Sequence, residues 1–347
     1  MTLDFTVAIP TYNGATRLPK ILERLRWQIG VDNLNWEVIV VDNNSQDNTA
    51  EIVIEYQANL SKNCTLKYCL EPKQGAAFAR ARAVQEADSE LVGLLDDDNL
   101  PASNWVEAAY TFGKSYPNAG AFASQIHGDF EVEPPAHFER IAPFLGITER
   151  GLEAHLYEPD KLILPPGAGL VVRKQAWCEA VPKYPLLKGR LGKSLVGGED
   201  LEPLLYLHKA GWEIWYNPAM ETYHQIPSWR LEKDYLIKLS YGVGLNSCCL
   251  RLIDIPFWKQ PSVLLRAFFG SIRRLIPQLI QYRKIIVQQE LSASFGELVA
   301  ACELGFNWGY LLSPFYFIQV SLIRRLTTCL SSLYSSSEAT ISSLNQN

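Results

Sequence analysis

The sequence predicts an α/β fold, in which a sheet is flanked by helices and followed by a helical extension. Two observations support this prediction: strand-like apolar runs alternate with helical segments over the first 126 residues, and the last third of the chain is apolar and basic. With 347 residues, of which 48% are hydrophobic and 20% charged, the chain can bury a core of ordinary size. The composition excludes disordered, collagen-like and small disulfide-stabilised proteins.

Apolar runs predict the strands of the sheet. These runs are residues 5–9, 36–41, 66–70, 91–95 and 119–125. Between the first two runs, apolar residues recur every three or four positions from Leu18 to Leu25, as in an amphipathic helix. Another helix is expected to begin after Gly75. Parallel strands joined by helices form a doubly wound sheet, which binds its ligands outside the carboxyl ends of the strands.

The alternation of strands and helices stops after the fifth run. Residues 127–166 contain several prolines and predict an irregular insertion. We expect a further strand at residues 169–173 and a helix at about 199–210 that ends at Gly211. A short last strand is expected at residues 212–216.

The charge of the chain is unevenly distributed. The net charge of −5 argues against binding of nucleic acid through positive charge, so we expect no nucleic-acid partner. Residues 240–330 carry nine basic and four acidic residues, whereas residues 1–239 carry 23 and 32. The first ten residues have no basic run before an apolar segment, which predicts a cytoplasmic location.

The basic part of the chain has two possible environments. Residues 304–323 are uncharged and long enough to span a membrane, but polar side chains dilute them. Residues 263–280 combine apolar side chains with arginines, which suits a helix lying on an anionic membrane. We therefore expect peripheral membrane contact through residues 250–325. The alternative, given equal weight, is that these helices pack on the core with a basic solvated face.

Polar residues follow three of the predicted strands. The first strand is followed by the turn Pro-Thr-Tyr-Asn-Gly at residues 10–14, the second by Asp-Asn-Asn-Ser at 42–45, and the fourth by three aspartates at 96–98. Mg²⁺ and Mn²⁺ prefer oxygen ligands and take part of their shell from phosphates, so this edge predicts a site for a metal-bound nucleoside diphosphate. Each motif alone is more typical of a solvated turn or helix cap. Neither a dinucleotide-binding nor a P-loop glycine pattern follows the first strand.

These motifs, together with Gly75 and Arg80, resemble in order those of family 2 glycosyltransferases of the GT-A fold. The resemblance covers about residues 4–230 and implies that Tyr12 stacks on a nucleobase, Asp42 binds it and Arg80 approaches the diphosphate. The donor-binding residues that it implies are Pro10, Thr11, Tyr12, Asn13, Asp42, Asn44, Gly75, Arg80, Asp96, Asp97 and Gly167. The metal ligands that it implies are Asp98, Asp96 and His224.

The resemblance also implies a general base at residues 197–200, Gly-Gly-Glu-Asp. Carboxylates in the first turn of a helix are stabilised as anions, so Asp200, with Glu199 beside it, is the predicted catalytic pair. An ordinary acidic helix N-terminus is the alternative interpretation.

The resemblance predicts three regions. These are a GT-A domain at 1–235, with a nucleotide-binding half (1–126) and an acceptor half (127–235), a helical region at 236–330 that contacts the membrane, and a disordered Ser-rich tail at 331–347. The whole-chain pattern also resembles cyanobacterial glycosyltransferases of hormogonium polysaccharide biosynthesis.

The predicted function is an inverting, Mg²⁺- or Mn²⁺-dependent transfer of one sugar from a nucleotide-diphosphate-sugar to a saccharide or lipid-linked acceptor at the inner face of the plasma membrane. The signature of processive synthases, Q-x-x-R-W, is absent from the sequence. Two alternatives stay open: a sugar-1-phosphate nucleotidyltransferase and a non-catalytic nucleotide-sugar-binding membrane subunit.

Overall fold

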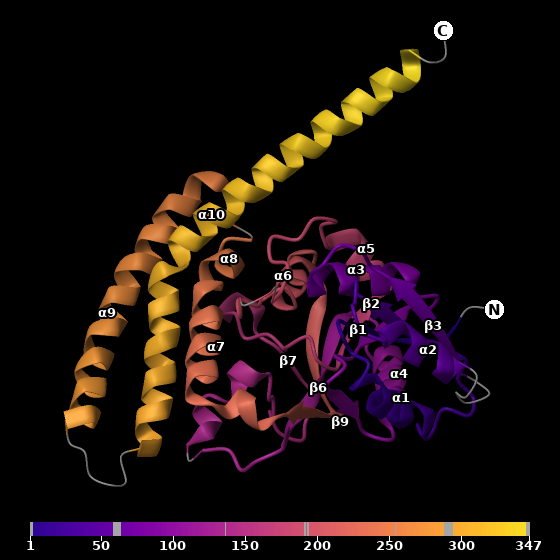
Figure 1. The fold of residues 1–347 in the computed structure, drawn as a ribbon, viewed down its shortest axis with the longest axis horizontal. Coiled ribbons are helices and arrows are strands. Elements are labelled where there is room, and N and C mark those ends of the chain that lie inside the picture. Colours follow the sequence, from indigo (N-terminus) through magenta and orange to yellow (C-terminus); the bar gives the residue numbers. More distant parts are fainter. Residues whose placement is uncertain are drawn as a thin grey trace.

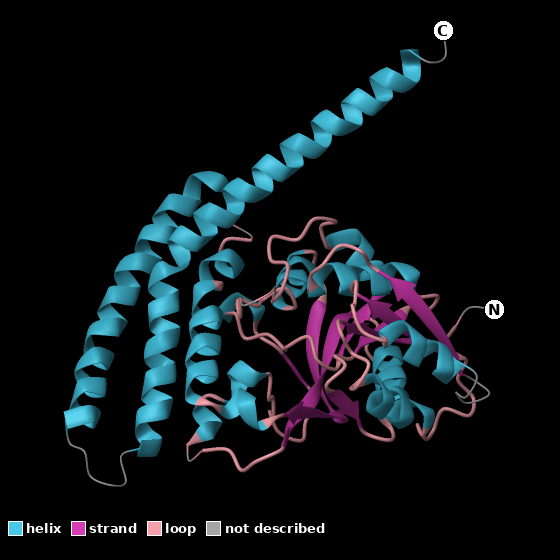
Figure 2. Cartoon of the chain, in the orientation of Figure 1, coloured by secondary structure: helices cyan, strands magenta, loops and turns pink. Residues whose placement is uncertain are grey.

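The computed structural model describes residues 3–57, 64–135, 137–190, 192, 194–253, 255–287 and 294–344. Within these residues a mixed sheet is covered by helices on both faces, and a helical lobe packs beside it (Figures 1 and 2). The strands are β1 (Phe5–Thr11), β2 (Trp36–Asp42), β3 (Cys64–Leu70), β4 (Leu91–Leu94), β5 (Asn99–Pro101), β6 (Ala119–Phe130), β7 (His155–Leu156), β8 (Leu170–Arg173) and β9 (Glu213–Ile226). The α-helices are α1 (Leu18–Arg26), α2 (Thr49–Gln57), α3 (Ala76–Glu86), α4 (Trp105–Ser115), α5 (Lys174–Ala180), α6 (Leu201–Lys209), α7 (Lys233–Leu245), α8 (Ser247–Arg251), α9 (Gln260–Val287) and α10 (Ser294–Leu344). Short 3₁₀ turns are η1 (Phe138–Arg140), η2 (Ala142–Leu145), η3 (Pro159–Lys161), η4 (Ser228–Leu231) and η5 (Phe257–Lys259).

The strand order of the sheet is β3-β2-β1-β4-β8-β6-β9-β5, with β7 paired to β9. Strands β1 to β4 are parallel, as expected from the strand–helix alternation. Strand β8 runs antiparallel to both of its neighbours, β4 and β6, and β5 runs antiparallel to β9. The mixed sheet with flanking helices and a helical extension that the sequence predicts is therefore confirmed.

Two apolar clusters hold the helices on the sheet. One face is covered by α1, α2 and α4, and includes Leu18, Leu25 and Trp105, which are fully buried. The other face is covered by α3, α5 and α6, and includes Ala83 and Leu204. The sheet is thus enclosed on both faces, which is why most residues of β1 and β2 are buried and apolar.

The register of the parallel strands places the candidate motifs next to one another. Thr11 at the end of β1 pairs with Asp42 at the end of β2. Leu94 at the end of β4 pairs with Ala8, and the Leu95 N–H donates to the Ala8 carbonyl at 3.0 Å. The acidic loop at 96–98 therefore begins beside the turn that follows β1, as the sequence predicts.

The last strand differs most from the prediction. Strand β9 continues beyond residue 216 to Ile226, so His224 lies within it instead of after it. The reason is an irregularity: Ser124 pairs with Asn217, but Gln125 pairs with Glu221, so the segment containing Pro218 bulges out of the pairing. The proline resembles the end of a strand in the sequence, whereas the sheet continues past it.

Other boundaries also differ from the expectation. The expected boundary between residues 126 and 127 falls inside β6, and that between 235 and 236 falls in the first turn of α7. Residues 331–344, for which the sequence predicts a disordered tail, continue α10 to Leu344 in the structure. After Pro314 no glycine or proline interrupts this helix, and each added residue gains one backbone hydrogen bond.

The helical lobe consists of α7, α9 and α10, which lie side by side (Figure 1). Residues 304–323, considered as a membrane-spanning candidate, form part of α10, which packs against α7 and α9. No helix among the described residues is long and apolar enough to cross a membrane.

Glycines bring α7 and α10 into close contact. A Cβ on Gly244 would lie 2.0 Å from the Phe306 carbonyl oxygen, and one on Gly309 would lie 2.1 Å from the Tyr241 carbonyl oxygen. Both atoms belong to backbone, which cannot move aside without separating the helices.

Gly309→Ala is therefore expected to lower the free energy of unfolding by about 1–3 kcal/mol, the usual cost of overpacking. The measurement is urea denaturation followed by circular dichroism. Gly270→Ala in α9 is the matched control, because its Cβ would meet no atom within 4 Å. Equal stability of the two variants would show that the α7–α10 contact contributes little to folding.

Candidate active site

A cavity of about 1150 Å³ lies beside the carboxyl ends of β1 and β4 and extends to the helical lobe. Its walls include the turn after β1, the acidic loop after β4, the insertion, the loop before α6 and parts of α7 to α10. The sequence-predicted residues that line it are Pro10, Thr11, Tyr12, Gly75, Arg80, Asp96, Asp97, Asp98, Gly167, Glu199, Asp200 and His224. Three further predicted residues, Asn13, Asp42 and Asn44, are not part of this lining.

The turn after β1 exposes an aromatic ring to the cavity. Tyr12 is 47% exposed, whereas Thr11 is buried and its hydroxyl donates to Asp97 Oδ2 at 2.5 Å. A Cβ on Gly14 would lie 2.0 Å from Thr11 Oγ1, so only glycine fits next to this hydrogen bond. The turn is thereby fastened to the acidic loop, with the ring of Tyr12 free for stacking.

The aspartate after β2 is buried behind the cavity wall. Asp42 accepts hydrogen bonds from Tyr68 Oη and from Ser45 N, each at 2.8 Å. Burial, together with this carboxylate, raises the pKa of Tyr68 to about 12. Its neighbour Asn43 lines the cavity instead and fastens the loop before α3 by accepting from Gly75 N at 2.7 Å. The predicted base-binding role of Asp42 stays a prediction.

The three aspartates after β4 have three different partners. Asp96 pairs with Arg80 (Oδ1 to Nη2, 2.8 Å), and Asp97 pairs with Arg17 (Oδ1 to Nε, 2.8 Å). Asp98 faces β9, because Asn99 in β5 pairs with His224 in the sheet. Each aspartate therefore has its own environment, although the three are consecutive in the chain.

Arg80 connects the acidic loop to the loop before α6. Its guanidinium is buried, with Nη2 on Asp96 and Nη1 3.3 Å from Glu199 Oε1. Burial alone would lower the pKa of Arg80, but the two carboxylates outweigh it and raise the pKa. Because these ion pairs occupy the guanidinium, its predicted role toward a diphosphate stays a prediction.

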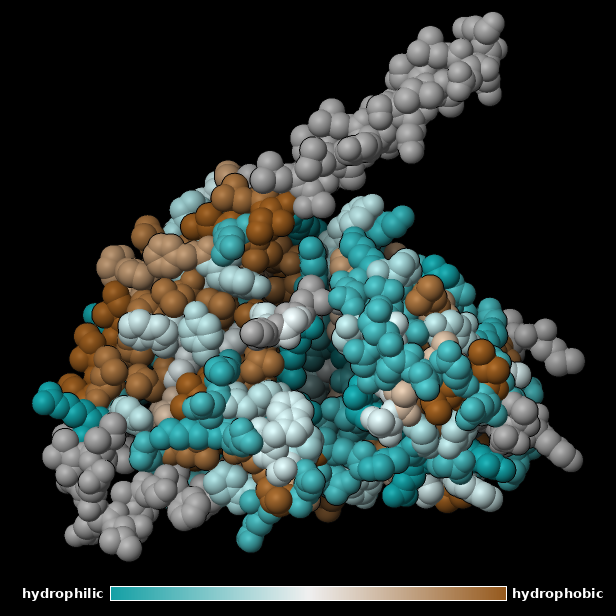
Figure 3. Space-filling model, viewed as in Figure 1, coloured by the Kyte–Doolittle hydropathy of each residue, from teal (hydrophilic) through white to brown (hydrophobic). Residues whose placement is uncertain are grey.

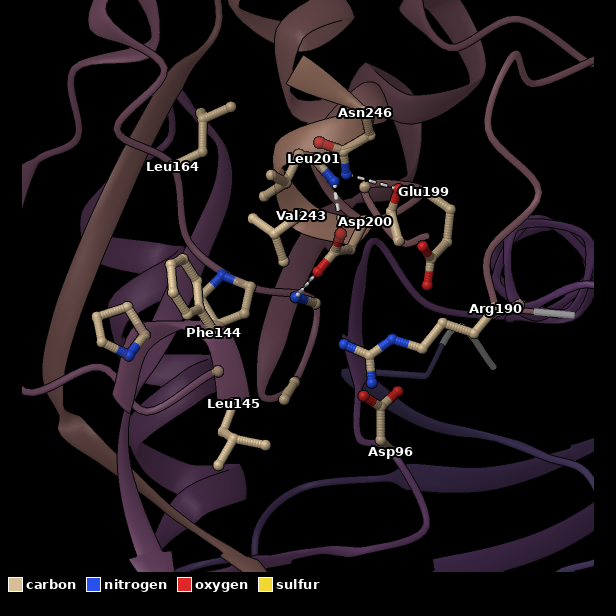
Figure 4. Close-up of a pocket in the computed structure, with 18 of the residues that line it drawn as sticks. Asp96, Phe144, Leu145, Leu164, Arg190, Glu199, Asp200, Leu201, Val243 and Asn246 are labelled. Carbon is tan, nitrogen blue, oxygen red and sulfur yellow. Dashed lines mark hydrogen bonds between the residues drawn. The ribbon is translucent and has the colours of Figure 1, made fainter. Parts of the chain in front are cut away.

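Asp200 caps α6 and faces the cavity (Figure 4). Its Oδ1 accepts from Leu201 N at 3.0 Å and its Oδ2 from Gly167 N at 2.9 Å. A Cβ on Gly167 would lie 2.8 Å from the Asp200 Cβ and 3.0 Å from the Arg80 Cζ. Each carboxylate oxygen can accept a second hydrogen bond, so this fixed side chain can still take a proton.

Glu199 is a buried neighbour of Asp200 with one oxygen on Arg80. Its other oxygen, Oε2, has no hydrogen-bond partner among the described residues. Burial raises the pKa of Glu199, and the charge of Asp200 adds to this effect, while Arg80 opposes it.

The raised pKa of Glu199 makes protein stability depend on pH. The folded state binds the proton more tightly than the unfolded chain, so the free energy of unfolding is expected to increase as the pH falls through the raised pKa toward its ordinary value of 4.5. Within this window the slope is about 1.4 kcal/mol per pH unit. Glu199→Gln is expected to remove this contribution, as measured by urea unfolding at several pH values. An unchanged slope in the variant would contradict this assignment.

Asp98, His224 and Arg230 meet at the edge of the cavity. His224 Nε2 lies 3.4 Å from Asp98 Oδ2, and Arg230 Nη1 lies 3.0 Å from the same oxygen and 2.9 Å from Nε2. Burial alone would raise the pKa of Asp98, but His224 and Arg230 outweigh it and hold this pKa well below its usual range.

The predicted metal ligands are only partly gathered. Among the residues that the structure describes, no group of three or more His, Cys, Asp or Glu side chains could hold a metal. Asp96 pairs with Arg80, which leaves Asp98 and His224 as neighbours. A carboxylate and an imidazole fit Mg²⁺ or Mn²⁺ when phosphate and water supply the other ligands.

Sequence reasoning missed six arginines that line the cavity: Arg17, Arg150, Arg190, Arg230, Arg251 and Arg274. Arg17 and Arg230 are held by aspartates of the acidic loop. Arg190, from the loop after α5, extends into the cavity and has no carboxylate within ion-pair distance among the described residues (Figure 4). The only sequence signal for Arg190 is its position between Lys188-Gly189 and Gly192 in a basic, glycine-containing segment.

Comparisons with known proteins place this chain among glycosyltransferases. The family profile described as "Glycosyl transferase family 2" matches residues 6–174. The glucosyl-dolichyl phosphate glucuronosyltransferase of Haloferax volcanii is 22% identical over 71% of this chain and 78% of its own length. The succinoglycan biosynthesis protein ExoM of Rhizobium meliloti is 23% identical over 70% of this chain and 74% of its own. Other curated relatives match over 20 to 39% of their own length.

A solved structure has the same fold. The mannosyltransferase PcManGT of Pyrobaculum calidifontis, in complex with GDP-Man and Mn²⁺, superimposes with a TM-score of 0.55 at 19% identity, over 93% of this chain and 87% of that one. The mixed sheet is thus of the GT-A type, residues 6–174 match the family 2 glycosyltransferase profile, and the protein is a glycosyltransferase.

Proposed function

We propose that the enzyme is a metal-dependent, inverting glycosyltransferase that moves one sugar from a nucleotide-diphosphate-sugar to a saccharide or lipid-linked acceptor. The observation that supports this most is the single cavity, which has Tyr12 and the acidic loop on one side and Asp200 on the other. A donor bound along the acidic loop would present its sugar toward the N-terminus of α6.

The donor would be held through both its base and its diphosphate. Tyr12 offers an exposed ring on which the nucleobase stacks, while Asn43 and Asp97 offer polar contacts at the strand ends. We assign the diphosphate to Arg190, because it makes no ion pair among the described residues and extends into the cavity toward the acidic loop (Figure 4). This assigns to Arg190 the role that the sequence suggested for Arg80.

Asp200 would act as the general base. It takes the proton of the acceptor hydroxyl while that oxygen bonds to the anomeric carbon, and the bond from this carbon to the diphosphate oxygen breaks. Attack from the side opposite to the leaving diphosphate inverts the anomeric centre. The hydrogen bond from Gly167 N fixes the carboxylate in position for this transfer.

Asp98 and His224 would hold the divalent cation together with the diphosphate. A bound Mg²⁺ or Mn²⁺ supplies positive charge that stabilises the departing diphosphate. Arg230 Nη1 now lies between the two side chains, so we propose that it turns away when a cation binds.

The proposed setting is polysaccharide assembly at the inner face of the plasma membrane. Two relatives support it by name, one for glucosyl-dolichyl phosphate and one for succinoglycan biosynthesis. Exposed apolar side chains on α9, such as Leu265 and Phe269, would provide the peripheral membrane contact. A nucleotidyltransferase is a weaker candidate, because the turn after β1 is Tyr-Asn-Gly instead of a glycine-rich loop with arginine and lysine.

A screen of nucleotide-sugars tests the proposal directly. At least one UDP- or GDP-sugar is expected to bind, or to be hydrolysed slowly, with Mn²⁺ or Mg²⁺ present. EDTA, or the substitution Asp98→Asn, is expected to weaken donor binding at least about tenfold, because a charged ligand to the cation is lost. The measurement is isothermal titration calorimetry of the donor with and without metal. If no nucleotide-sugar binds with either metal, the proposal is wrong.

A further inference from the structure

We propose that Arg251 and Arg274 form a subsite for the phosphate or diphosphate that links a lipid to the acceptor sugar. The inference rests on the proposed glycosyltransferase function and names its acceptor class. Both arginines lie beyond residue 174, where the match to the family profile ends.

Helices α8, α9 and α10 place the two guanidinium groups around one aromatic ring. Arg251 ends α8, Arg274 lies on α9, and both flank the ring of Tyr310 on α10, with Cζ 5.7 and 5.5 Å from the ring centroid. All three residues line the same cavity as Asp200. Tyr310 is buried and therefore holds both guanidinium groups at the cavity wall.

The charges of these two arginines are not neutralised. Neither has a carboxylate within ion-pair distance among the described residues, whereas Arg17, Arg80 and Arg230 in the same cavity each pair with an aspartate. Two cations in the wall of one cavity favour a doubly charged anion, and guanidinium groups match the oxygens of phosphate.

The helix that carries Arg251 begins beside the loop that carries the proposed base. Asn246, at the end of α7, donates from Nδ2 to the Gly197 carbonyl oxygen at 2.7 Å and so ties the helical lobe to the loop that carries Asp200. Arg251 follows Asn246 by five residues, a rise of about 7.5 Å along a helix. Asp200 and the two arginines line the same cavity, so one acceptor can place its sugar at the base and its anionic linkage at the arginines.

The surroundings of the subsite favour a lipid over a free phosphate. Leu250 and Phe306 line the cavity near the arginines. Figure 3 shows apolar side chains gathered over the helical lobe, and the exposed ones on α9 include Phe269 and Ile276. Arg274 shares the inner face of α9 with buried Ser271, so it points away from this apolar surface toward the cavity. A lipid phosphate fits these two surfaces, because its anionic head would bind in the cavity and its apolar chain would lie along the helical lobe.

Binding of farnesyl diphosphate, a short soluble lipid diphosphate, tests the proposal with the full-length protein. Wild-type enzyme is expected to bind it, and Arg251→Gln/Arg274→Gln is expected to weaken binding at least about tenfold, because two charge-assisted contacts are lost. Donor binding with Mn²⁺ is expected to stay unchanged in the variant. The matched control is Arg266→Gln/Arg273→Gln, which removes two exposed arginines of α9 that do not line the cavity.

Three outcomes would overturn the inference. Farnesol binding as tightly as farnesyl diphosphate would show that the site recognises only the apolar chain. Binding of inorganic diphosphate as tightly as farnesyl diphosphate would show that the site recognises only the anion and not a lipid. A parallel loss of donor binding in the Arg251→Gln/Arg274→Gln variant would place the donor diphosphate at these arginines. Failure of wild-type protein to bind any nucleotide-sugar is a separate result, which contradicts the proposed function itself.

Discussion

Replacing Asp200 by Asn is expected to lower the rate of sugar transfer about 10³-fold, within the range that a general base contributes, while donor affinity stays within about twofold. The amide keeps the shape of the side chain, and its one carbonyl oxygen can still accept from Gly167 N, while the hydrogen bond from Leu201 N is lost. It cannot take the proton of an acceptor hydroxyl. The measurement combines the transfer rate at saturating acceptor with calorimetric titration of the donor.

Asp88→Asn is the matched control, because Asp88 is an exposed aspartate near the start of β4, at the opposite end of this strand from the acidic loop. It is expected to transfer sugar at the wild-type rate. Unchanged transfer by the Asp200 variant would exclude this residue as the base. A wild-type protein that binds the donor but shows no transfer to any acceptor would favour the alternative of a non-catalytic binding subunit.

Gly167→Ala is expected to reduce the transfer rate about 10²-fold through the position of Asp200. The added Cβ would lie 2.8 Å from the Asp200 Cβ and 3.0 Å from the Arg80 Cζ, and neither neighbour can give way freely. Arg80 is held by Asp96 and Glu199, and Asp200 is held by the start of α6. A displacement of about 1 Å in a reacting group commonly costs this much in rate.

The rate of the Gly167→Ala variant is measured alongside its thermal unfolding, so that loss of folding is separated from loss of positioning. Gly270→Ala again serves as the control, since its methyl group meets no atom within 4 Å. We expect the Gly167 variant to lose transfer while it still unfolds cooperatively. A wild-type rate would show that the loop adapts without moving the base.

Much of the fold follows from local patterns. Strands β1, β2 and β4 are mostly apolar and buried by helices on both faces, and α1 has its buried residues at helical spacing. Glycine positions were also informative: Gly75 has φ of 135°, and a Cβ there would lie 2.7 Å from the Lys188 carbonyl oxygen. Such positions are visible in a sequence because only one residue type fits the backbone.

The partners within the site were not predictable in the same way. Arg80 looked like a ligand for phosphate, yet it is buried between Asp96 and Glu199, which lie 16 and 119 residues away. Arg230 pairs with Asp98 across 132 residues. No local pattern encodes a contact of this length, because it depends on how β9 passes the acidic loop.

The sequence by itself determined which residues arrive at the cavity: strand ends in a parallel sheet meet at one edge, so the turn after β1 and the aspartates after β4 had to converge. The tertiary structure alone decided how their charges are paired. Three aspartates in a row have three different arginine or histidine neighbours, and the arginines at residues 190, 251 and 274 have no carboxylate partner among the described residues. The physical reason is that the pKa and the ion-pair partners of a buried charged group depend on the groups that packing places around it. Its neighbours along the chain do not determine them.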